Sequence, residues 1–480
     1  MENDKVTVLV SSSFEGIRAE VLKRVNPSES ERKKVQDLAK KLTTTVEKEA
    51  KERKLEADVR VEGSVAKNTW LRDCPEIDVF IQVPKTVPRE AFETVCLEIA
   101  KKATEGYEQI ERFAEHPYLE AIMDNVWVNI VPCYKVTQGE WVSATDRTPF
   151  HTDYVKQYLD EKLGEETRLL KRFMKGIEVY GAEIKVGGFS GYLCELLVLH
   201  YGSFAKVLQA AGNWKEPIII DPEGFYKKRE AIKTVFDEPL VMVDPVDKER
   251  NVAAAVRKDR LDEFIAASRE FMKSPNIEYF YPPETVALEK TELVSKIKDR
   301  ASAIVFIAFG GSAVPDILWG QLYRSQKALR NLITNYDFKI LGDAIWSDQK
   351  NLNVFVFELE SHFLPNMKHH LGPPLENRAG CESFLQKHRG ADSTVSGPRI
   401  EDGRWIVDVK RQYTDVLELL NKTLSDGGKC AGVAEIVSKA ISESVQILVN
   451  EEVMDMHSTS AGFAKFLTEY LEGKPRWLKV

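Results

Sequence analysis

The chain has 480 residues, of which 43% are hydrophobic and 30% are charged, a composition typical of folded globular proteins and not of disordered or fibrous ones. At roughly 100–200 residues per domain, this length predicts three or four folded units. The net charge of −8 and the pI near 5.7 argue against a protein that coats nucleic acid through an evenly basic surface, but they allow a local basic cleft.

The apolar runs and the cysteines argue against a membrane-spanning, secreted or zinc-binding protein. No run approaches the roughly 20 apolar residues that span a bilayer, and VTVLV near the start is shorter than a signal-peptide core. We therefore expect a cytoplasmic protein. The six cysteines are scattered, without a CxxC pair or a Cys/His spacing suited to zinc, so we expect reduced and mostly buried thiols.

The first 105 residues alternate between helix and strand patterns. Ser28 and Glu31 match a capping box, which marks the start of a long amphipathic helix. Two runs with strand periodicity follow, and Pro84 ends the second of them. The predicted helix, strand, loop or short helix, strand and helix lie at about 28–54, 57–63, 64–70, 77–83 and 89–105.

The run 118–134 holds two apolar segments around Asp124-Asn125. This dipeptide tolerates the left-handed conformation of a tight turn. The run therefore predicts a hairpin whose two antiparallel strands extend the same sheet.

The rest of the chain predicts a helical domain and then an α/β unit. Residues 152–270 show apolar positions three and four apart, which is typical of helices. A proline-bearing linker follows at 274–284, and 301–360 reads strand, helix, strand, strand, the pattern of a helix packed on an antiparallel sheet. Loops, a strand at 404–413 and helices to about residue 471 complete a multidomain α+β chain.

Glu76 and Asp78 are the first candidates for catalysis. Residues two apart in a strand point to the same side, so this pair presents two carboxylates together. Such a pair can hold Mg²⁺ for two-metal phosphoryl transfer, although it could equally form a solvated acidic edge. Upstream, Gly63 permits close approach of the backbone, and Ser64 and Lys67 offer a hydroxyl and a cation to a phosphate.

Eight ordered motifs carry a resemblance to a known family. They are GSVAKNTW (63–70), EIDVF (76–80), AEHPY (114–118), VPCY (131–134), DRTPFH (146–151), RLLKRF (168–173), YGAEIKVGGFSGYLCELL (180–197) and DPVDKERNVAA (244–254). Together they resemble the archaeal, class I CCA-adding enzymes, a branch of the polymerase-beta-like nucleotidyltransferases. The resemblance implies template-independent addition of C, C and A to the 3′ end of tRNA from CTP and ATP, with Mg²⁺ and release of pyrophosphate.

The resemblance also implies a domain plan. Residues 1–150 would form a nucleotidyltransferase head with a mixed sheet, 151–275 a helical neck that binds nucleotide, and 276–480 an α/β body and tail that grip the acceptor stem and T arm of tRNA. A ferredoxin-like unit is expected at about 300–360. The family likeness is consistent with a homodimer. Aromatic residues of the body could contact RNA or fill the core, and the sequence does not separate these roles for Phe306 and the residues near it.

The resemblance assigns roles residue by residue. Glu76 and Asp78 would ligate the metals, and Arg250 would help to read the incoming base. The other matched positions would hold the triphosphate and sugar, and they are Ser64, Lys67, Thr148, His151, Lys171 and Tyr180. At Lys67 the family more often has arginine, so the charge is kept but bidentate geometry is lost. Arg250 could instead have a structural role, paired with Asp244 or Asp247 on a loop.

Asn129 departs from the family pattern, which has a third metal-binding aspartate two residues before VPCY. An amide is neutral, a poorer ligand, and unable to accept a proton from the attacking 3′-OH. Three explanations stay open: a substitution introduced to trap an unreacted complex, a naturally slow or inactive chain, and replacement of the ligand by Asp124, which is poorly placed as a turn residue.

Two other functions remain alternatives to CCA addition. One is a poly(A) polymerase or another polymerase-beta-like RNA nucleotidyltransferase. The other is a catalytically disabled tRNA-binding protein, for which Asn129 is the supporting feature.

Overall fold

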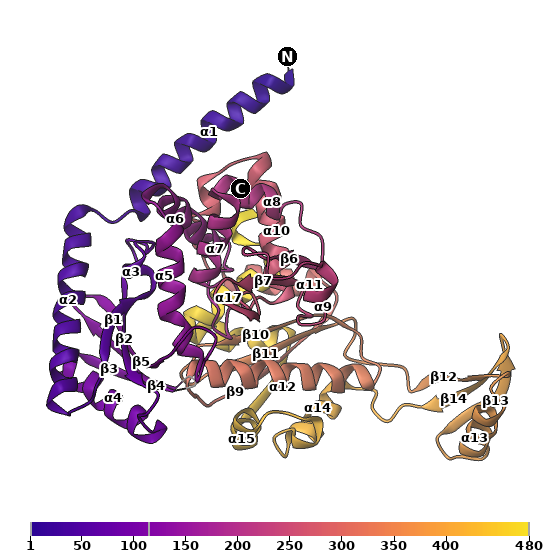
Figure 1. The fold of residues 1–480 in the computed structure, drawn as a ribbon. Helices are drawn as coiled ribbons and strands as arrows, with labels where there is room; N and C mark the ends of the chain where they lie inside the picture. The colour runs from indigo at the N-terminus through magenta and orange to yellow at the C-terminus, as the bar shows by residue number, and fades with distance from the viewer. Residues whose placement is uncertain (1, 114–115, 479–480) are drawn as a thin grey trace. The chain divides into compact units, whose positions relative to one another are not determined.

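The computed structural model describes residues 2–113 and 116–478. The chain folds into two compact units. Unit 1 consists of the chain up to Pro283 together with the C-terminal segment from Arg476, and unit 2 comprises Glu284–Pro475. Helices and sheets occur in both, as the α+β expectation required (Figure 1); the sheets of unit 1 are mixed and those of unit 2 are antiparallel. Ala114 and Glu115 of the motif AEHPY lie outside the described residues.

The first part of unit 1 confirms the predicted order of elements. Its helices and strands are α1 (Glu2–Val25), α2 (Glu29–Glu52), β1 (Asp58–Glu62), α3 (Gly63–Ala66), β2 (Glu76–Pro84), α4 (Arg89–Ala103), β3 (Glu108–Phe113), β4 (Pro117–Met123) and β5 (Val126–Lys135). Ser28 caps α2, and the complete capping box with Glu31 is present. The strand β3 was not predicted.

These strands form one mixed sheet in the order β1-β2-β5-β4-β3. The strand β2 pairs antiparallel with β1 and parallel with β5, and the hairpin β4–β5 turns at Asp124 and Asn125, both with positive φ as predicted. Alternate residues of β2 pack with α2 and α4 in one hydrophobic core, while α5 (Thr148–Tyr158) contacts β1 (Figure 1). The register places Asp78 beside Asn129.

The second part of unit 1 is mainly helical, as expected. It contains, after α5, the helices α6 (Glu161–Gly176), α7 (Gly191–Tyr201), α8 (Phe204–Ala211), α9 (Arg229–Lys233) and α10 (Lys258–Lys273) and the short 3₁₀ segments η1 (Ala144–Arg147), η2 (Ile277–Tyr279) and η5 (Arg476–Leu478). Their apolar faces share one large core, which also takes in Trp477.

Two expectations for this region were wrong. A small sheet in the order β6-β7-β8 lies within it, formed by β6 (Ile218–Ile220), β7 (Leu240–Asp244) and β8 (Asp247–Asn251). The motif around Arg250 is therefore a β-hairpin and not a loop. The segment expected as a linker at 274–284 instead packs into the core, because Tyr279 and Phe280 are buried there.

Unit 2 contains the predicted strand, helix, strand and strand as β9 (Ala303–Phe309), α12 (Pro315–Asn335), β10 (Ile340–Ser347) and β11 (Asn353–Leu359). A fourth strand, β15 (Val445–Val449), completes the sheet in the order β10-β11-β9-β15. This βαββαβ arrangement is ferredoxin-like, and it extends well beyond residue 360. The remaining helices are α11 (Lys290–Asp299), α14 (Val416–Leu424), α15 (Glu435–Glu443), α16 (Met454–Thr459) and α17 (Ala461–Glu472), with η3 (Lys429–Ala431) and η4 (Asn450–Val453).

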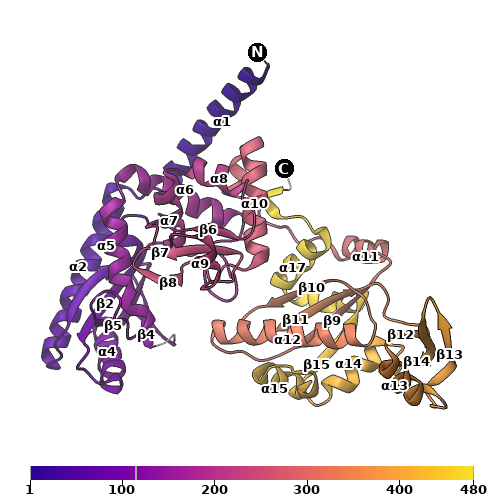
Figure 2. The ribbon, with the colours of Figure 1, turned by 45° about the vertical axis from the view of Figure 1, so that its right-hand side comes forward.

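A separate three-stranded sheet is inserted between β11 and α14. It has the order β12-β14-β13, from β12 (Met367–Pro374), β13 (Thr394–Glu401) and β14 (Arg404–Lys410), with α13 (Arg378–His388) beside it (Figure 2). In the main sheet Phe306 and Phe309 are buried, so they are core residues.

The domain boundaries predicted near residues 150 and 275 stay predictions; both positions lie within the Met1–Pro283 part of unit 1. The six cysteines are free thiols, and four of them are buried, as expected. None of the described helices is long and apolar enough to cross a membrane.

Candidate active site

Glu76, Asp78 and Asn129 meet where β2 and β5 run side by side. The side-chain amide of Asn129 donates to Glu76 Oε1 at 2.6 Å and to Asp78 Oδ1 at 2.9 Å. The strand periodicity that predicted a shared face for the two carboxylates therefore holds, and the parallel register brings the third matched position to them. Glu76 is exposed and Asp78 is half-buried.

The charges at this point suit a divalent cation. Burial and then the neighbouring Glu76 carboxylate raise the pKa of Asp78 to about 7, against the hydrogen bond from Asn129, which lowers it. The N–H donors of Asn129 thus hold the two crowded carboxylates. Rotating the amide by half a turn would direct its oxygen there instead, and oxygen is the ligand that Mg²⁺ prefers.

The cluster has only two acidic members. Within residues 2–113 and 116–478 there is no group of three His, Cys, Asp or Glu side chains arranged for a metal. The exposed Asp124 lies in the β4–β5 turn with a φ of +53°, five residues from Asn129. It is a turn residue in the structure too, which argues against its serving as the missing ligand.

Gly63 fits the turn between β1 and β2 closely. It has a φ of +69°, and a Cβ at this position would overlap Oδ2 of Asp78. Only glycine therefore allows the backbone to run beside this carboxylate. Ser64 follows in the first turn of α3 and is partly exposed.

Lys67 and Lys171 converge on a residue that sequence reasoning missed, Glu195 of α7. Lys67 Nζ lies 2.5 Å from Glu195 Oε2, and Lys171 Nζ lies 3.0 Å from Oε1. Thr69 Oγ1 also donates to Oε1, at 2.5 Å. Although burial of the carboxylate raises its pKa, the charges of Lys171 and Lys67 and these hydrogen bonds lower the pKa of Glu195 to about 2.

A second buried carboxylate, Asp244 of β7, organises the other predicted side chains. His151 Nε2 lies 2.8 Å from Asp244 Oδ2, and Arg250 donates to the same oxygen at 2.7 Å. The Tyr192 hydroxyl donates to Oδ1 at 3.3 Å, and its ring stacks on His151 with centroids 4.1 Å apart. The structural pairing of Arg250 with Asp244 thus exists; Asp247 pairs instead with Arg147, at 2.7 Å.

The two remaining matched residues flank these clusters. Thr148 begins α5, three residues before His151 and on the same helix. Tyr180 follows α6, and its hydroxyl lies 3.0 Å from where a Cβ on Gly191 would be. Lys171 Nζ lies 3.5 Å from the same point, so the glycine leaves room for both groups.

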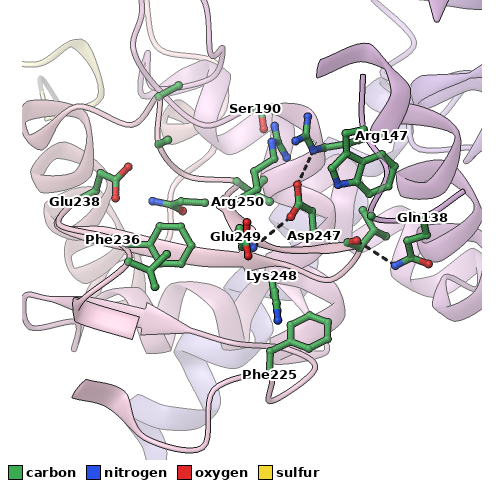
Figure 3. A pocket seen from close by; sticks show the side chains of 18 of the residues that line it. Gln138, Arg147, Ser190, Phe225, Phe236, Glu238, Asp247, Lys248, Glu249 and Arg250 are labelled. Atoms are coloured by element: carbon green, nitrogen blue, oxygen red, sulfur yellow. Dashed lines mark hydrogen bonds and ion pairs between the residues drawn. The ribbon is translucent and has the colours of Figure 1, made fainter. Parts of the chain in front are cut away.

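A cavity of about 1190 Å³ opens beside Arg250. Figure 3 shows Arg147 bonded to Asp247 on its wall, with Phe225 and Phe236 among the lining side chains. Arg147 also lies over the Trp141 ring, 5.3 Å from its centroid. The cavity therefore offers guanidinium groups and aromatic faces, the chemistry that binds a nucleobase by hydrogen bonds and stacking.

Glu195 was missed for a physical reason. Glu195 stands in the strongly apolar run GYLCELLVLHY, which reads as core, and its partners lie 24 and 128 residues away. A charged residue inside such a run was the available signal, because a carboxylate is almost never fully buried unless it is paired.

Three family models match the chain in succession. They describe a nucleotidyltransferase domain at residues 44–154, the second domain of tRNA nucleotidyltransferases at 165–281, and the C-terminal domain of CCA-adding enzymes at 300–450. The candidate active site falls in the first two of these segments.

Curated relatives match over almost the whole chain. The CCA-adding enzyme of Methanosarcina mazei is 37% identical over 92% of this chain and 96% of its own. The enzyme of Methanosarcina acetivorans is 38% identical over 92% of this chain and 95% of its own. The enzyme of Saccharolobus islandicus is 37% identical over 85% of this chain and 92% of its own. The chain therefore belongs to the archaeal CCA-adding enzyme family.

Proposed function

We propose that the chain adds C, C and A to the 3′ end of tRNA, taking CTP and ATP as donors and releasing pyrophosphate. The observation that carries this proposal is the meeting of Glu76, Asp78 and Asn129 in a chain whose relatives are CCA-adding enzymes along nearly their full length. The two other clusters, around Glu195 and Asp244, supply the cations that a nucleotide needs.

In the reaction the 3′ oxygen of tRNA forms a bond to the α-phosphorus of the NTP, and the bond from that phosphorus to the β-phosphate bridging oxygen breaks. Pyrophosphate leaves with the added negative charge. Lys67 and Lys171, both buried, would hold the triphosphate and neutralise that charge, because ammonium groups stabilise transferring phosphates. Ser64 and Thr148 would add hydroxyl donors, with His151 and Tyr180 next to the sugar.

Glu76, Asp78 and the amide oxygen of Asn129 would hold the divalent cations, and we propose Mg²⁺. When bound, such ions activate the attacking hydroxyl and neutralise the departing pyrophosphate. Asn129 can neither carry a negative charge nor accept a proton. The proton of the 3′-OH therefore has no carboxylate acceptor on β5, which predicts slow turnover.

Arg250 would help to select C and A over G and U. Asp244 fixes one of its nitrogens and leaves other donors of the guanidinium for a base edge at the cavity. A wrong base would leave buried polar groups unpaired, at about 1–3 kcal/mol each.

The partner is tRNA, and we propose that the body formed by unit 2 binds its acceptor stem and T arm. A homodimer and a cytoplasmic location remain predictions. The family models for the second and C-terminal domains favour CCA addition over poly(A) synthesis. The hydrogen bonds of Asn129 favour a second candidate, a tRNA-binding protein whose head is disabled.

The test compares the chain with Asn129→Asp on tRNA that lacks its CCA end, with Mg²⁺ and each labelled NTP in turn. Asn125→Asp, a change of the same chemistry in the exposed β4–β5 turn, is the control. We expect C and then A to be added, at least tenfold faster by Asn129→Asp and unchanged by Asn125→Asp.

Three outcomes separate the candidates. If Asn129→Asp adds neither C nor A, CCA addition is wrong. Activity only in Asn129→Asp would show that the asparagine blocks catalysis, as in a disabled tRNA-binding protein. Runs of A on unstructured RNA without C incorporation would instead indicate a poly(A) polymerase.

A further inference from the structure

Glu195 lies between the two lysines that face the triphosphate. It is 1% exposed, and Lys67 and Lys171 are 7% and 2% exposed. Each lysine binds a different oxygen of the one carboxylate, at 2.5 and 3.0 Å. Thr69 ties the group further: its hydroxyl donates to Glu195 at 2.5 Å, and Lys171 Nζ lies 3.1 Å from that same hydroxyl.

The charges of this cluster do not cancel. Two ammonium groups and one carboxylate leave these three buried side chains with one net positive charge, and the charge of Lys67 also acts on the carboxylates of Glu62 and Asp78. A buried charge is unfavourable unless a partner neutralises it, so the cluster is suited to a bound anion. Both lysines also come from motifs matched to triphosphate binding, whereas Glu195 has no such role assigned.

We propose that Glu195 is a positioning residue for the triphosphate: it holds Lys67 and Lys171 as a fixed pair and offsets half of their charge, so that nucleotide binds and pyrophosphate can still leave. This inference rests on the proposed function, since it assigns the two lysines to the triphosphate. Glu195 does not touch the reacting atoms; it acts through the lysines.

Removing the carboxylate charge should therefore trap the product. Glu195→Gln keeps the size of the side chain and acceptors for hydrogen bonds, but it raises the net charge of the cluster from one to two. Attraction between opposite charges grows strongly where water is excluded. A residue that merely stabilised the fold would lower the melting temperature when changed and would not tighten anion binding.

The experiment measures the Kd of pyrophosphate with Mg²⁺ for the full chain by isothermal titration calorimetry, together with the melting temperature. We expect Glu195→Gln to lower the Kd at least threefold, and Glu195→Asp, which keeps the charge, to leave it within twofold. Glu166→Gln is the matched control. Glu166 is 5% exposed in the same unit but binds Arg18 and the amide of Phe204, so its loss should lower the melting temperature alone.

An unchanged or higher Kd in Glu195→Gln would overturn the proposal. Should that variant not fold, Lys171→Gln gives a second test: it removes the net charge of the cluster, so the Kd should rise at least tenfold, and an unchanged Kd would again contradict the charge balance described. Binding of pyrophosphate needs no turnover. Failure here is thus distinct from failure of CCA addition, which the Asn129→Asp assay reports.

Discussion

Asn129 donates hydrogen bonds to Glu76 and Asp78 at the position where an aspartate would add a third negative charge. Hydrogen bonds to charged acceptors stabilise a fold by about 1.5–3 kcal/mol each. The hydrogen bonds from the Asn129 amide therefore offset part of the repulsion between the two carboxylates.

Asn129→Asp removes the amide donors, so the loss of these hydrogen bonds should appear as a change in the melting temperature. In EDTA at pH 7 the variant should melt several degrees below the unchanged chain, because three carboxylates repel one another. Added Mg²⁺ or Mn²⁺ should raise its melting temperature more than that of the unchanged chain. Differential scanning calorimetry with and without cation measures both. Equal melting temperatures in EDTA would mean that the amide bridges carry no stability.

Glu195 predicts a specific acid sensitivity. Its pKa is about 2 in the folded chain and 4.5 as the ordinary value, so its folded pKa is depressed. Its contribution to stability is therefore full above about pH 4.5 and is lost as the pH falls toward 2. At pH 7 the Glu195→Gln variant should have a lower melting temperature than the unchanged chain. Between about pH 4.5 and 2, however, its melting temperature should fall by less than that of the unchanged chain. A parallel loss in both proteins would contradict the charge pairing.

Individual residues were predictable where chemistry and local spacing coincide. Glu76 and Asp78 are two apart on a strand, so their common face follows from strand geometry. The contacts of Glu195 with Lys67 and of Asp244 with His151 are different, because each joins residues that lie far apart in the sequence. Sequence spacing contains no information on such contacts.

The turn between β1 and β2 sets how closely the chain passes the Asp78 carboxylate. Gly63 combines a φ of +69° with close contact to Asp78, whereas Gly106 has a φ of +89° and open space around it. Replacing each glycine by alanine therefore distinguishes two effects. Backbone strain is expected at both positions, whereas contact with the Asp78 carboxylate is expected only at Gly63.

Gly63→Ala should reduce nucleotide addition in the Asn129→Asp background at least tenfold, because the new methyl group displaces Asp78. Gly106→Ala should leave that activity unchanged. Each change should also lower stability by about 1 kcal/mol through the positive φ, and Gly63→Ala by more. Rates and melting temperatures measure the two effects. Equal losses of activity in both variants would show that backbone strain, and not contact with Asp78, is the cause.

Elements were predicted well where a local signal defines their ends. The capping box of Ser28 and the Asp124-Asn125 turn are such signals, and α2 and the β4–β5 hairpin lie where expected. The strand β3, EQIERF, was missed because four of its six residues are polar or charged. It lies at the edge of the sheet, where it pairs with β4. The hairpin β7–β8 was missed because its second strand, DKERN, is polar throughout.

Unit 1 is closed by residues from the far end of the chain. Trp477 is 5% exposed, stacks on Tyr279 with centroids 5.3 Å apart, and donates to Glu263 at 2.5 Å. It joins the same core as the helices of the second part of unit 1. Unit 2 is thus an insertion between Pro283 and Arg476.

Trp477→Ala should destabilise unit 1 by about 3–5 kcal/mol, the usual effect of emptying a buried aromatic site. Leu478→Ala is the control, because Leu478 is 48% exposed and should change stability by less than about 0.5 kcal/mol. Urea unfolding followed by circular dichroism measures both. If the two changes have equal effects, the stacking of Trp477 does not hold the unit together.

The insertion also gives synthesis of the chain a built-in delay. The ribosome completes the first 283 residues of unit 1 and then makes all of unit 2 before Trp477 emerges. Roughly 190 residues at about 5–20 per second correspond to a wait of about 10–40 s. During that time Tyr279 lacks the stacking partner that Trp477 provides, so unit 1 stays incomplete until unit 2 has had time to fold.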